Sequence, residues 1–327
     1  MKKRIAIVLA GILVVVLGRG FFYYSGFYSP PPSEIPSYEH IVAPLAPSTE
    51  FSDVYEKGEG IILIDLSHDN DFDIEELNVL TSRLISRGLT TEIFSPEDDL
   101  KKELLGEEAE EGEGEDEDED EDEKEGNLEE ELQVADVYII VCPQAEFSKE
   151  ERETVDEFVN NGGKLLLIAD PTRPSQINSI SLKFGLIFEA DYLYNIKENE
   201  ANYRNIFVTE FKGNEITMGI EKIALYTSGS ITSVGSGIAF VDENTFSSLI
   251  ETRKGLSPIA LANDSKVLAL HDLTFMTEPH NGILDNNLLI SNIADWLASP
   301  TEEEEEVEGE EEEQQEQVES SEEEKGT

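Results

Sequence analysis

Side chains that can do acid–base or ligand chemistry follow several short apolar runs of this sequence. The run "LIDL", residues 63–66, leads into the polar stretch "SHDNDF", and later runs end in a similar way. Imidazoles and carboxylates transfer protons or hold ligands, and amides orient them. The candidate binding residues are His68, Asn70, Asp170, Arg173, His271, Asp272, Asp285 and Asn286. The competing interpretation is structural, because Asp and Asn at such turns commonly cap helices.

The first of these segments also resembles a calcium loop, since Asp69, Asp71 and Asp73 alternate as in an EF-hand. An EF-hand requires glycine at its sixth position and glutamate at its twelfth. These positions hold Ile74 and Leu80 in this chain, so the coordination sphere cannot close. We predict no bound metal.

The motifs of several common enzyme classes are absent from the sequence. It contains no Walker A sequence, no G-x-G-x-x-G after a strand, no G-x-S-x-G elbow and no H-E-x-x-H. The single cysteine, Cys142, lies in the apolar context "VYIIVCP", which is typical of a buried structural thiol and excludes a CxxC pair. We predict no cofactor.

The elements that must position the candidate residues alternate between strands and helices. Strands are expected at residues 61–66, 89–94, 135–143 and 164–170. The segments "DIEE", from Asp73, and "SKEE", from Ser148, resemble capping boxes that begin the intervening helices. Two such units predict a doubly wound α/β fold with a mostly parallel sheet, in which ligands bind beyond the carboxyl ends of the strands.

The C-terminal part of the expected domain carries shorter and more mixed signals. Between residues 171 and 261, brief apolar runs separated by glycine-rich turns predict short strands that elaborate the sheet. A strand over 265–275 and a helix over 286–298 then close the ordered region. His271 and Asp272 would therefore lie at a strand end close to those of the earlier units.

The N-terminus predicts a membrane placement. The basic residues of "MKKR" precede an apolar run that reaches residue 24, which favours a signal-anchor helix over residues 1–28. Its basic end would stay in the cytoplasm and the rest of the chain would lie outside the cell membrane. A cleaved signal peptide is the alternative, and it would also export the domain. A proline-rich stalk is expected over 29–50 and the domain over 51–300.

Two tracts carry most of the net charge of −50. Residues 106–131 have a net charge of −17 and residues 301–327 one of −14. Both are predicted to be disordered acidic segments, the first as an insertion in the domain and the second as a tail; weak binding of divalent cations or of a basic partner is the alternative. Without a basic stripe, a nucleic-acid partner is not expected.

Three segments, taken together, resemble a known family. They are "IDLSHDNDF", "ADVYIIVCP" with the following "FSKEERETVDEFVNNGGKLLLIAD", and "LHDLTFMTEPHNGILDNNLLISNIADWL". They resemble the DUF4350 group of prokaryotic, often archaeal, membrane-anchored proteins, which is similar in turn to the class I glutamine amidotransferase-like superfamily. The resemblance implies a flavodoxin-like fold. The nucleophile elbow of that superfamily corresponds to "DPTR" from Asp170, which has no cysteine, so amidotransferase catalysis is not expected.

These observations favour a membrane-anchored binding or interaction module over an enzyme. A small molecule, a glycan or a partner protein would bind at the carboxyl ends of the strands, near His68 and Asp272. The alternative is a hydrolase in which Asp272 or Asp285 works with His68 or His271, with or without a divalent metal.

Overall fold

The computed structural model describes residues 2–24, 44–48, 51–55, 57–95, 128–249 and 254–299. The chain divides into two compact units, Met1–Ala43 and Pro44–Thr327. The first contains one described helix, α1 (Lys2–Tyr24). Its segment Lys3–Tyr24 has 22 residues and contains an 18-residue window with a mean hydropathy of 2.5, which is long and apolar enough to cross a bilayer. A signal sequence near an N-terminus has the same character.

The second unit is built on an eight-stranded mixed sheet with the order β2-β1-β3-β4-β14-β13-β11-β8. The first five strands in this order are mutually parallel, and the last three join them in antiparallel fashion. The strands are β1 (Gly60–Asp65), β2 (Leu89–Phe94), β3 (Val137–Val141), β4 (Lys164–Ile168), β8 (Glu210–Phe211), β11 (Gly237–Phe240), β13 (Ile259–Ala262) and β14 (Val267–Leu270). The expectation of an α/β fold with a mostly parallel central sheet is confirmed.

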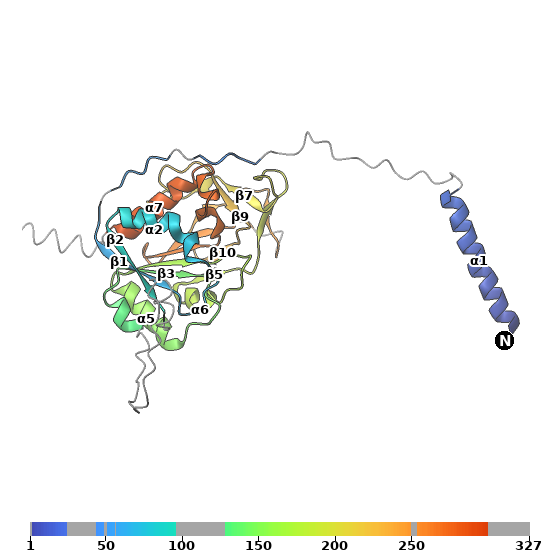
Figure 1. Ribbon diagram of the computed structural model, residues 1–327, viewed down its shortest axis with the longest axis horizontal. Coiled ribbons are helices and arrows are strands. Elements are labelled where there is room, and N and C mark those ends of the chain that lie inside the picture. Colours follow the sequence, from blue (N-terminus) through green and yellow to red (C-terminus); the bar gives the residue numbers. More distant parts are fainter. Residues whose placement is uncertain are drawn as a thin grey trace, which may run out of the picture. The chain divides into compact units, whose positions relative to one another are not determined.

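Helices cover both faces of this sheet (Figure 1): α2 (Asn78–Ser86) and α7 (Asn286–Ala298) lie on one face, and α5 (Lys149–Asn160) and α6 (Asn178–Ser181) on the other. Both predicted capping boxes are present, at Asp73 and at Ser148. The box at Asp73 begins a 3₁₀ turn, η2 (Ile74–Leu77), that continues into α2. The polar residues after β1 thus enter their helix through a tighter turn than the periodicity predicts.

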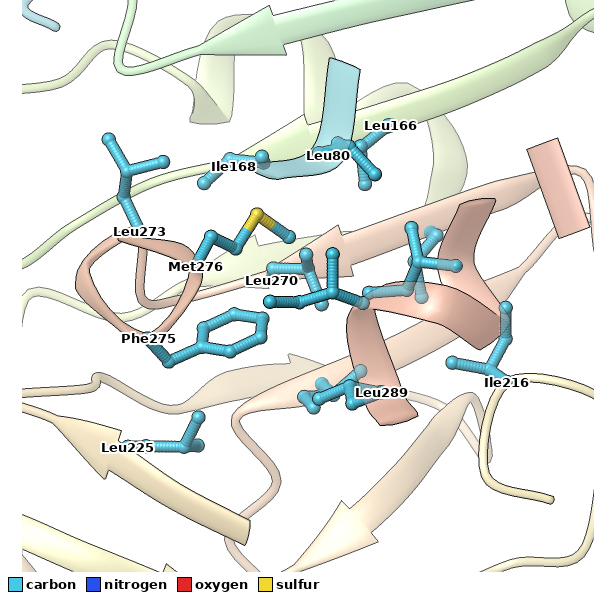
Figure 2. Close-up of a cluster of buried hydrophobic side chains, with 14 of the residues drawn as sticks. Leu80, Leu166, Ile168, Ile216, Leu225, Leu270, Leu273, Phe275, Met276 and Leu289 are labelled. Carbon is cyan, nitrogen blue, oxygen red and sulfur yellow. The ribbon is translucent and has the colours of Figure 1, made fainter. Parts of the chain in front are cut away.

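The core has two layers because successive strand residues point to opposite faces of the sheet. Figure 2 shows Leu166 of β4 and Leu270 of β14 packing with Leu289 of α7 on one face. On the other face, Leu165 and its strand neighbours pack with Val155 of α5. All residues of β3, β4 and β14 are buried, as expected for strands covered on both faces.

Residues between β4 and β14 form three small antiparallel sheets in addition to the strands that extend the central one. These pairs are β5 (Leu186–Phe188) with β10 (Ile231–Ser233), β6 (Leu193–Asn195) with β12 (Thr245–Ser247), and β7 (Asn205–Val208) with β9 (Ile223–Tyr226). The apolar runs at residues 185–195, 205–211, 222–230 and 237–242 predict most of these strands, but β10, β12 and β13 lie outside all four runs. They are three- or four-residue strands that depend on their pairing partners rather than on a local pattern.

Two boundaries differ from the sequence-based expectation. The compact unit begins at Pro44 rather than near Phe51, because Leu45 N–H donates to Glu200 Oε1 at 3.0 Å and Ser48 N–H donates to the Gly282 carbonyl at 2.8 Å. The end of the predicted stalk is therefore bonded to the domain. The end of the predicted acidic insertion forms a short helix, α4 (Leu128–Leu132), whose two leucines are buried. Residues 25–43, 106–127 and 301–327, which carry the rest of the stalk, insertion and tail predictions, lie outside the described residues.

The helix α4 gives a test of where the insertion ends. Deleting residues 106–127 removes no buried side chain of the described structure, so the free energy of unfolding should match that of the intact chain. Extending the deletion to residue 131 removes Leu128, and this should lower the free energy of unfolding by about 2–4 kcal/mol. Urea unfolding followed by circular dichroism measures both, and equal stability of the two deletions would contradict the role of α4.

Candidate functional site

The eight predicted residues lie in three places of the folded domain. His68 and Asn70 follow β1; Asp170 and Arg173 follow β4, and His271 and Asp272 follow β14; Asp285 and Asn286 lie at the start of α7. The groups after β4 and β14 are neighbours because these strands are adjacent and parallel. The pair at the start of α7 is held against β9 instead.

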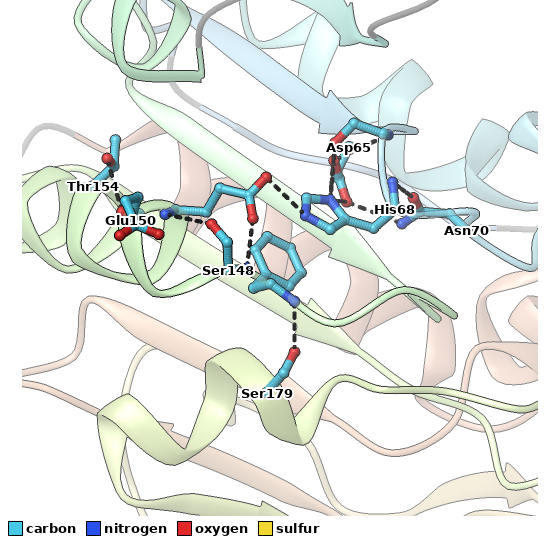
Figure 3. Close-up of polar contacts among 10 residues, drawn as sticks. Asp65, His68, Asn70, Ser148, Glu150, Thr154 and Ser179 are labelled. Carbon is cyan, nitrogen blue, oxygen red and sulfur yellow. Dashed lines mark hydrogen bonds and ion pairs between the residues drawn. The ribbon is translucent and has the colours of Figure 1, made fainter.

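His68 is buried between two carboxylates (Figure 3). Its Nδ1 lies 3.0 Å from Asp65 Oδ2, and its Nε2 lies 3.4 Å from Glu151 Oε1. The ring stacks on Phe147, with 3.6 Å between ring centroids. Burial alone would lower the pKa of His68, but the hydrogen bond and charge of Asp65 and the charge of Glu151 raise it. The imidazole therefore ties the end of β1 to the start of α5, and the two carboxylates favour its protonated form.

Asn70 completes this arrangement by closing the loop onto the neighbouring strand. Its Nδ2 donates to Asp65 Oδ2 at 3.2 Å and to the Val141 carbonyl at 2.9 Å, and its Oδ1 accepts from His68 N–H at 3.1 Å. The sequence analysis missed Asp65 and Glu151. Asp65 ends an apolar strand, and Glu151 is the last residue of a capping box, so each has a local structural role that hides the tertiary contact.

Asp170 is a fully satisfied structural carboxylate. Oδ1 accepts from Thr172 N–H at 2.8 Å and from its hydroxyl at 2.6 Å, while Oδ2 accepts from Leu273 N–H and the Thr274 hydroxyl, both at 3.3 Å. A carboxylate has about four acceptor positions, and these bonds use all of them. Asp170 therefore joins the end of β4 to the loop after β14.

Arg173 makes a bidentate ion pair with Glu76, with Nη1–Oε2 and Nη2–Oε1 distances of 2.7 and 2.5 Å. Nη1 also donates to the Asp71 carbonyl at 2.7 Å. The bond from Arg173 lowers the pKa of Glu76, and the carboxylate in turn raises the pKa of Arg173. Glu76 belongs to the capping box of η2, so the guanidinium links the loop after β4 to the loop after β1.

His271 is a buried neutral imidazole. Burial lowers its pKa below the ordinary value. Nδ1 lies 3.2 Å from the Ser230 carbonyl, which requires the proton to be on Nδ1 and leaves Nε2 as an acceptor. Among the described residues, Nε2 has no hydrogen-bond partner. The ring packs so closely on Gly229 that a Cβ there would lie 2.3 Å from it, so glycine is required at this position.

Asp272 faces away from His271 and does not reach solvent. Oδ2 accepts from Tyr226 N–H at 2.5 Å, whereas Oδ1 is buried without a hydrogen-bond partner. Burial raises the pKa of Asp272 well above its ordinary value, and the charge of Asp170 raises it further. The side chain holds β9 against the central sheet.

Asp285 and Asn286 form hydrogen bonds with β9 and with the turn that precedes it. Asp285 Oδ2 accepts from the N–H groups of Glu221 and Lys222, both at 2.9 Å, but makes no side-chain cap to its own helix. Asn286 pairs with both main-chain groups of Ala224, at 3.0 and 2.9 Å. The Asn286 side-chain amide thus forms the two hydrogen bonds that the main chain of a neighbouring strand would form with Ala224. The competing structural interpretation, helix capping, therefore does not hold for the Asp285 side chain, because the turn before β9 binds the carboxylate instead.

One cavity brings three of the predicted residues together. It has a volume of about 300 Å³ and lies beyond the carboxyl ends of β4 and β14, where Asp170, Arg173 and His271 line it. Asp191 and Tyr192, which the sequence analysis missed, line it as well. Asp191 accepts from Ser230 N–H and the hydroxyls of Ser230 and Ser247, which leaves one acceptor position open. His68, Asn70, Asp272, Asp285 and Asn286 do not line this cavity.

A second cavity, of about 330 Å³, lies at the opposite edge of the sheet and holds none of the predicted residues. Lys164 lines it, but its ammonium donates to the carbonyls of Trp296 and Ser299, both at 2.5 Å. The Lys164 ammonium therefore caps the C-terminal end of α7. We therefore place the candidate site at the cavity near His271, where a buried imidazole keeps an open acceptor.

The described residues offer neither a metal-binding cluster nor a reactive thiol. No cluster of three or more His, Cys, Asp or Glu side chains there could hold a metal ion. Cys142 is buried, as predicted, and burial raises the pKa of its thiol to about 12. A thiol of this kind stays protonated and is a poor nucleophile.

No protein-family model matches the chain, and no curated protein matches it in sequence. The fold is similar to that of the mmIFT52 N-terminal domain, with a TM-score of 0.54 and 13% identity over 73% of this chain and 97% of that domain. A putative ThuA-like protein from Parabacteroides merdae matches with a TM-score of 0.42 and 10% identity over 75% of this chain and 91% of its own. The cytoplasmic protein STM3548 from Salmonella typhimurium matches with a TM-score of 0.41 and 12% identity over 73% and 99%. At 13% identity, the similarity to the first of these structures shows a shared fold and gives no information about a ligand.

The raised pKa of His68 predicts a pH-dependent contribution to stability. Its folded-state pKa lies above the unfolded value of about 6.5, so this contribution is complete below about pH 6.5 and is lost as pH rises through the folded-state pKa. The loss of unfolding free energy in His68→Gln should therefore be larger at about pH 5.5 than at about pH 8.5.

His280 provides the matched control, because burial lowers its pKa. The wild-type chain should lose stability relative to His280→Gln as pH falls through about 6.5, the opposite direction. Urea titrations across the pH range measure both differences. A His68→Gln effect that stays constant with pH would show that the imidazole between Asp65 and Glu151 is not charged in the folded state.

Proposed function

We propose that this chain is a membrane-anchored, extracytoplasmic binding protein whose α/β domain holds a small ligand beyond the carboxyl ends of β4 and β14. The supporting observation is the cavity of about 300 Å³ at this edge, lined by Arg173, His271 and Asp191. Its volume is at the lower end of the range for ligand pockets, and its position is the usual one in open α/β sheets. His271 supplies an acceptor that no described residue uses.

Binding is better supported than hydrolysis because the carboxylates have structural partners. Asp170 uses all its acceptor positions. Asp272 is buried and accepts from Tyr226 N–H, and Asp285 accepts from N–H groups of the turn before β9. An acid–base catalyst must exchange a proton with the substrate, whereas these three carboxylates, including Asp170 at the cavity, are engaged by hydrogen bonds within the fold. The high pKa of Cys142 likewise opposes amidotransferase chemistry, for which a thiolate is needed.

The finer fold assignment is part of the same proposal. The parallel strands run in the order β2-β1-β3-β4-β14, which corresponds to the flavodoxin-like order 2-1-3-4-5, and helices lie on both faces of the sheet. This order supports a doubly wound arrangement and the resemblance to the DUF4350 and amidotransferase-like proteins. The antiparallel strands β13, β11 and β8 are an addition to that pattern.

The proposed membrane placement follows from the helix α1 and its flanking charges. Lys2, Lys3 and Arg4 precede the apolar segment, which would keep this end in the cytoplasm and export the domain. Protease added to intact cells that express the full-length chain should digest the domain, while a cytoplasmic marker protein stays whole. Full protection of the domain, with digestion after the cells are lysed, would contradict this topology.

Ligand binding at the cavity can be tested by blocking it. Saturation-transfer NMR on the full-length protein in lipid nanodiscs would screen neutral sugars, amines, carboxylates and organic phosphates. Ala190→Trp fills the candidate cavity, and Ala135→Trp places the same side chain in the cavity at the opposite edge. We expect at least one compound class to bind, to be lost in Ala190→Trp and to be kept in Ala135→Trp, with thermal melts confirming that both variants fold. Absence of binding, or binding that Ala190→Trp leaves unchanged, would overturn the proposal.

A further inference from the structure

An exposed strip of aromatic side chains begins at the candidate cavity and continues along the small β6–β12 sheet. It consists of Tyr192, Tyr194, Tyr203 and Phe246, and we call it the aromatic strip. Tyr192 lines the cavity, and its ring centroid lies 6.2 Å from that of Tyr194. Tyr194 lies 5.9 Å from Phe246 and 6.5 Å from Tyr203. Tyr203 and Phe246 are 46% and 38% exposed, so the outer part of the strip is accessible to a ligand.

Pairing across the sheet explains part of this arrangement. Tyr194 and Phe246 are directly opposite each other in the β6–β12 ladder, and cross-strand aromatic pairs stabilise small sheets. This pairing does not require Tyr192 at the cavity or Tyr203 from the following loop. Continuity with the cavity is the additional feature, because one ligand could lie in the cavity and along the strip together.

The polar groups beside the aromatic strip supply both hydrogen-bond acceptors and donors. His271 and Asp191 line the cavity, and His271 Nε2 and one acceptor position of Asp191 have no hydrogen-bond partner among the described residues. The guanidinium of Arg204, which carries several hydrogen-bond donors, lies 4.4 Å from the Tyr192 ring and 5.7 Å from the Tyr203 ring. A ligand that fits must therefore both donate and accept hydrogen bonds next to aromatic faces.

The charges at the cavity oppose an anionic ligand, and the cation of Arg204 opposes a second cation along the aromatic strip. Asp170, Glu189 and Asp191 line the cavity, and its one lining cation, Arg173, is paired with Glu76, so an anion would be repelled. A cationic ligand would seek the ring faces of Tyr192 and Tyr203, where Arg204 already lies. A ligand that extends from the cavity along the aromatic strip is therefore expected to be uncharged, with hydrogen-bonding groups and apolar faces.

We propose that the ligand is a neutral saccharide, with one sugar residue in the cavity beside His271 and further residues along the aromatic strip. Sugar hydroxyls both donate and accept, which matches the acceptors of the cavity and the donors of Arg204. The C–H faces of pyranose rings pack on aromatic rings by apolar burial. Because Arg204 lies over Tyr192 and Tyr203, Phe246 is the ring of the strip on which we expect a sugar residue to stack. This inference rests on the proposed binding function and specifies its ligand class.

The test uses neutral gluco-, manno- and xylo-oligosaccharides, from disaccharides to hexasaccharides, with isothermal titration calorimetry of the full-length protein in nanodiscs. At least one series should bind, and its affinity should rise with the length of the oligosaccharide as residues reach Phe246. Phe246→Ala should weaken binding of the longer members about tenfold, the usual scale for an aromatic anchor, and Phe246→Tyr should keep it. Ile85→Ala removes a 59% exposed side chain of α2, away from the aromatic strip, and should have no effect.

The outcomes separate this inference from the proposed function. If none of the three series binds, or Phe246→Ala binds like the wild-type chain with an unchanged melting temperature, the saccharide proposal is overturned. If another compound class binds and is lost in Ala190→Trp, the cavity function stands without the saccharide. If oligosaccharides bind equally well to Ala190→Trp, the aromatic strip acts alone and the cavity proposal fails.

Discussion

The burial of the central strands on both faces is the constraint on which the rest of this domain depends. Every residue of β3, β4 and β14 is buried, so side chains in the middle of these strands cannot meet a ligand. Chemistry is confined to the strand ends, where main-chain groups also lose their neighbours and need partners. Asp170 and Asp272 supply those partners. Polar residues at this edge therefore serve the fold first, and the site is formed by the few that the fold leaves available.

His271 is the clearest example of a polar residue at the strand ends that the fold leaves available. The Ser230 carbonyl fixes its tautomer, Gly229 makes room for its ring, and burial keeps it neutral. In a neutral imidazole, an Nε2 without a hydrogen-bond partner can accept from a hydroxyl group, and no ion pair competes for it. His68, by contrast, is held by carboxylates on both sides and joins two elements. The same residue type at two strand ends thus has a proposed recognition role in one place and a structural role in the other.

The sequence predicts those features that are locally encoded. The parallel strand and helix units and both capping boxes follow from short patterns around Asp73 and Ser148, and they are present. The partner of a carboxylate cannot be predicted in this way, because Asp272 binds a main-chain group 46 residues distant and Asp285 one 64 residues distant. Asp191 and Tyr192 carry no motif, and they reach the cavity only because the small sheets fold back onto the end of β14.

The central claim is that His271 presents an unprotonated Nε2 to a ligand beyond the ends of β4 and β14. The most direct measurement is ¹⁵N NMR of the histidine side chains in the full-length protein, before and after addition of an oligosaccharide that binds. We predict that His271 shows a protonated Nδ1 and an unprotonated Nε2 at neutral pH, and that the Nε2 resonance shifts when the sugar is added. A charged His271, or an Nε2 resonance that does not respond to the bound sugar, would contradict the account.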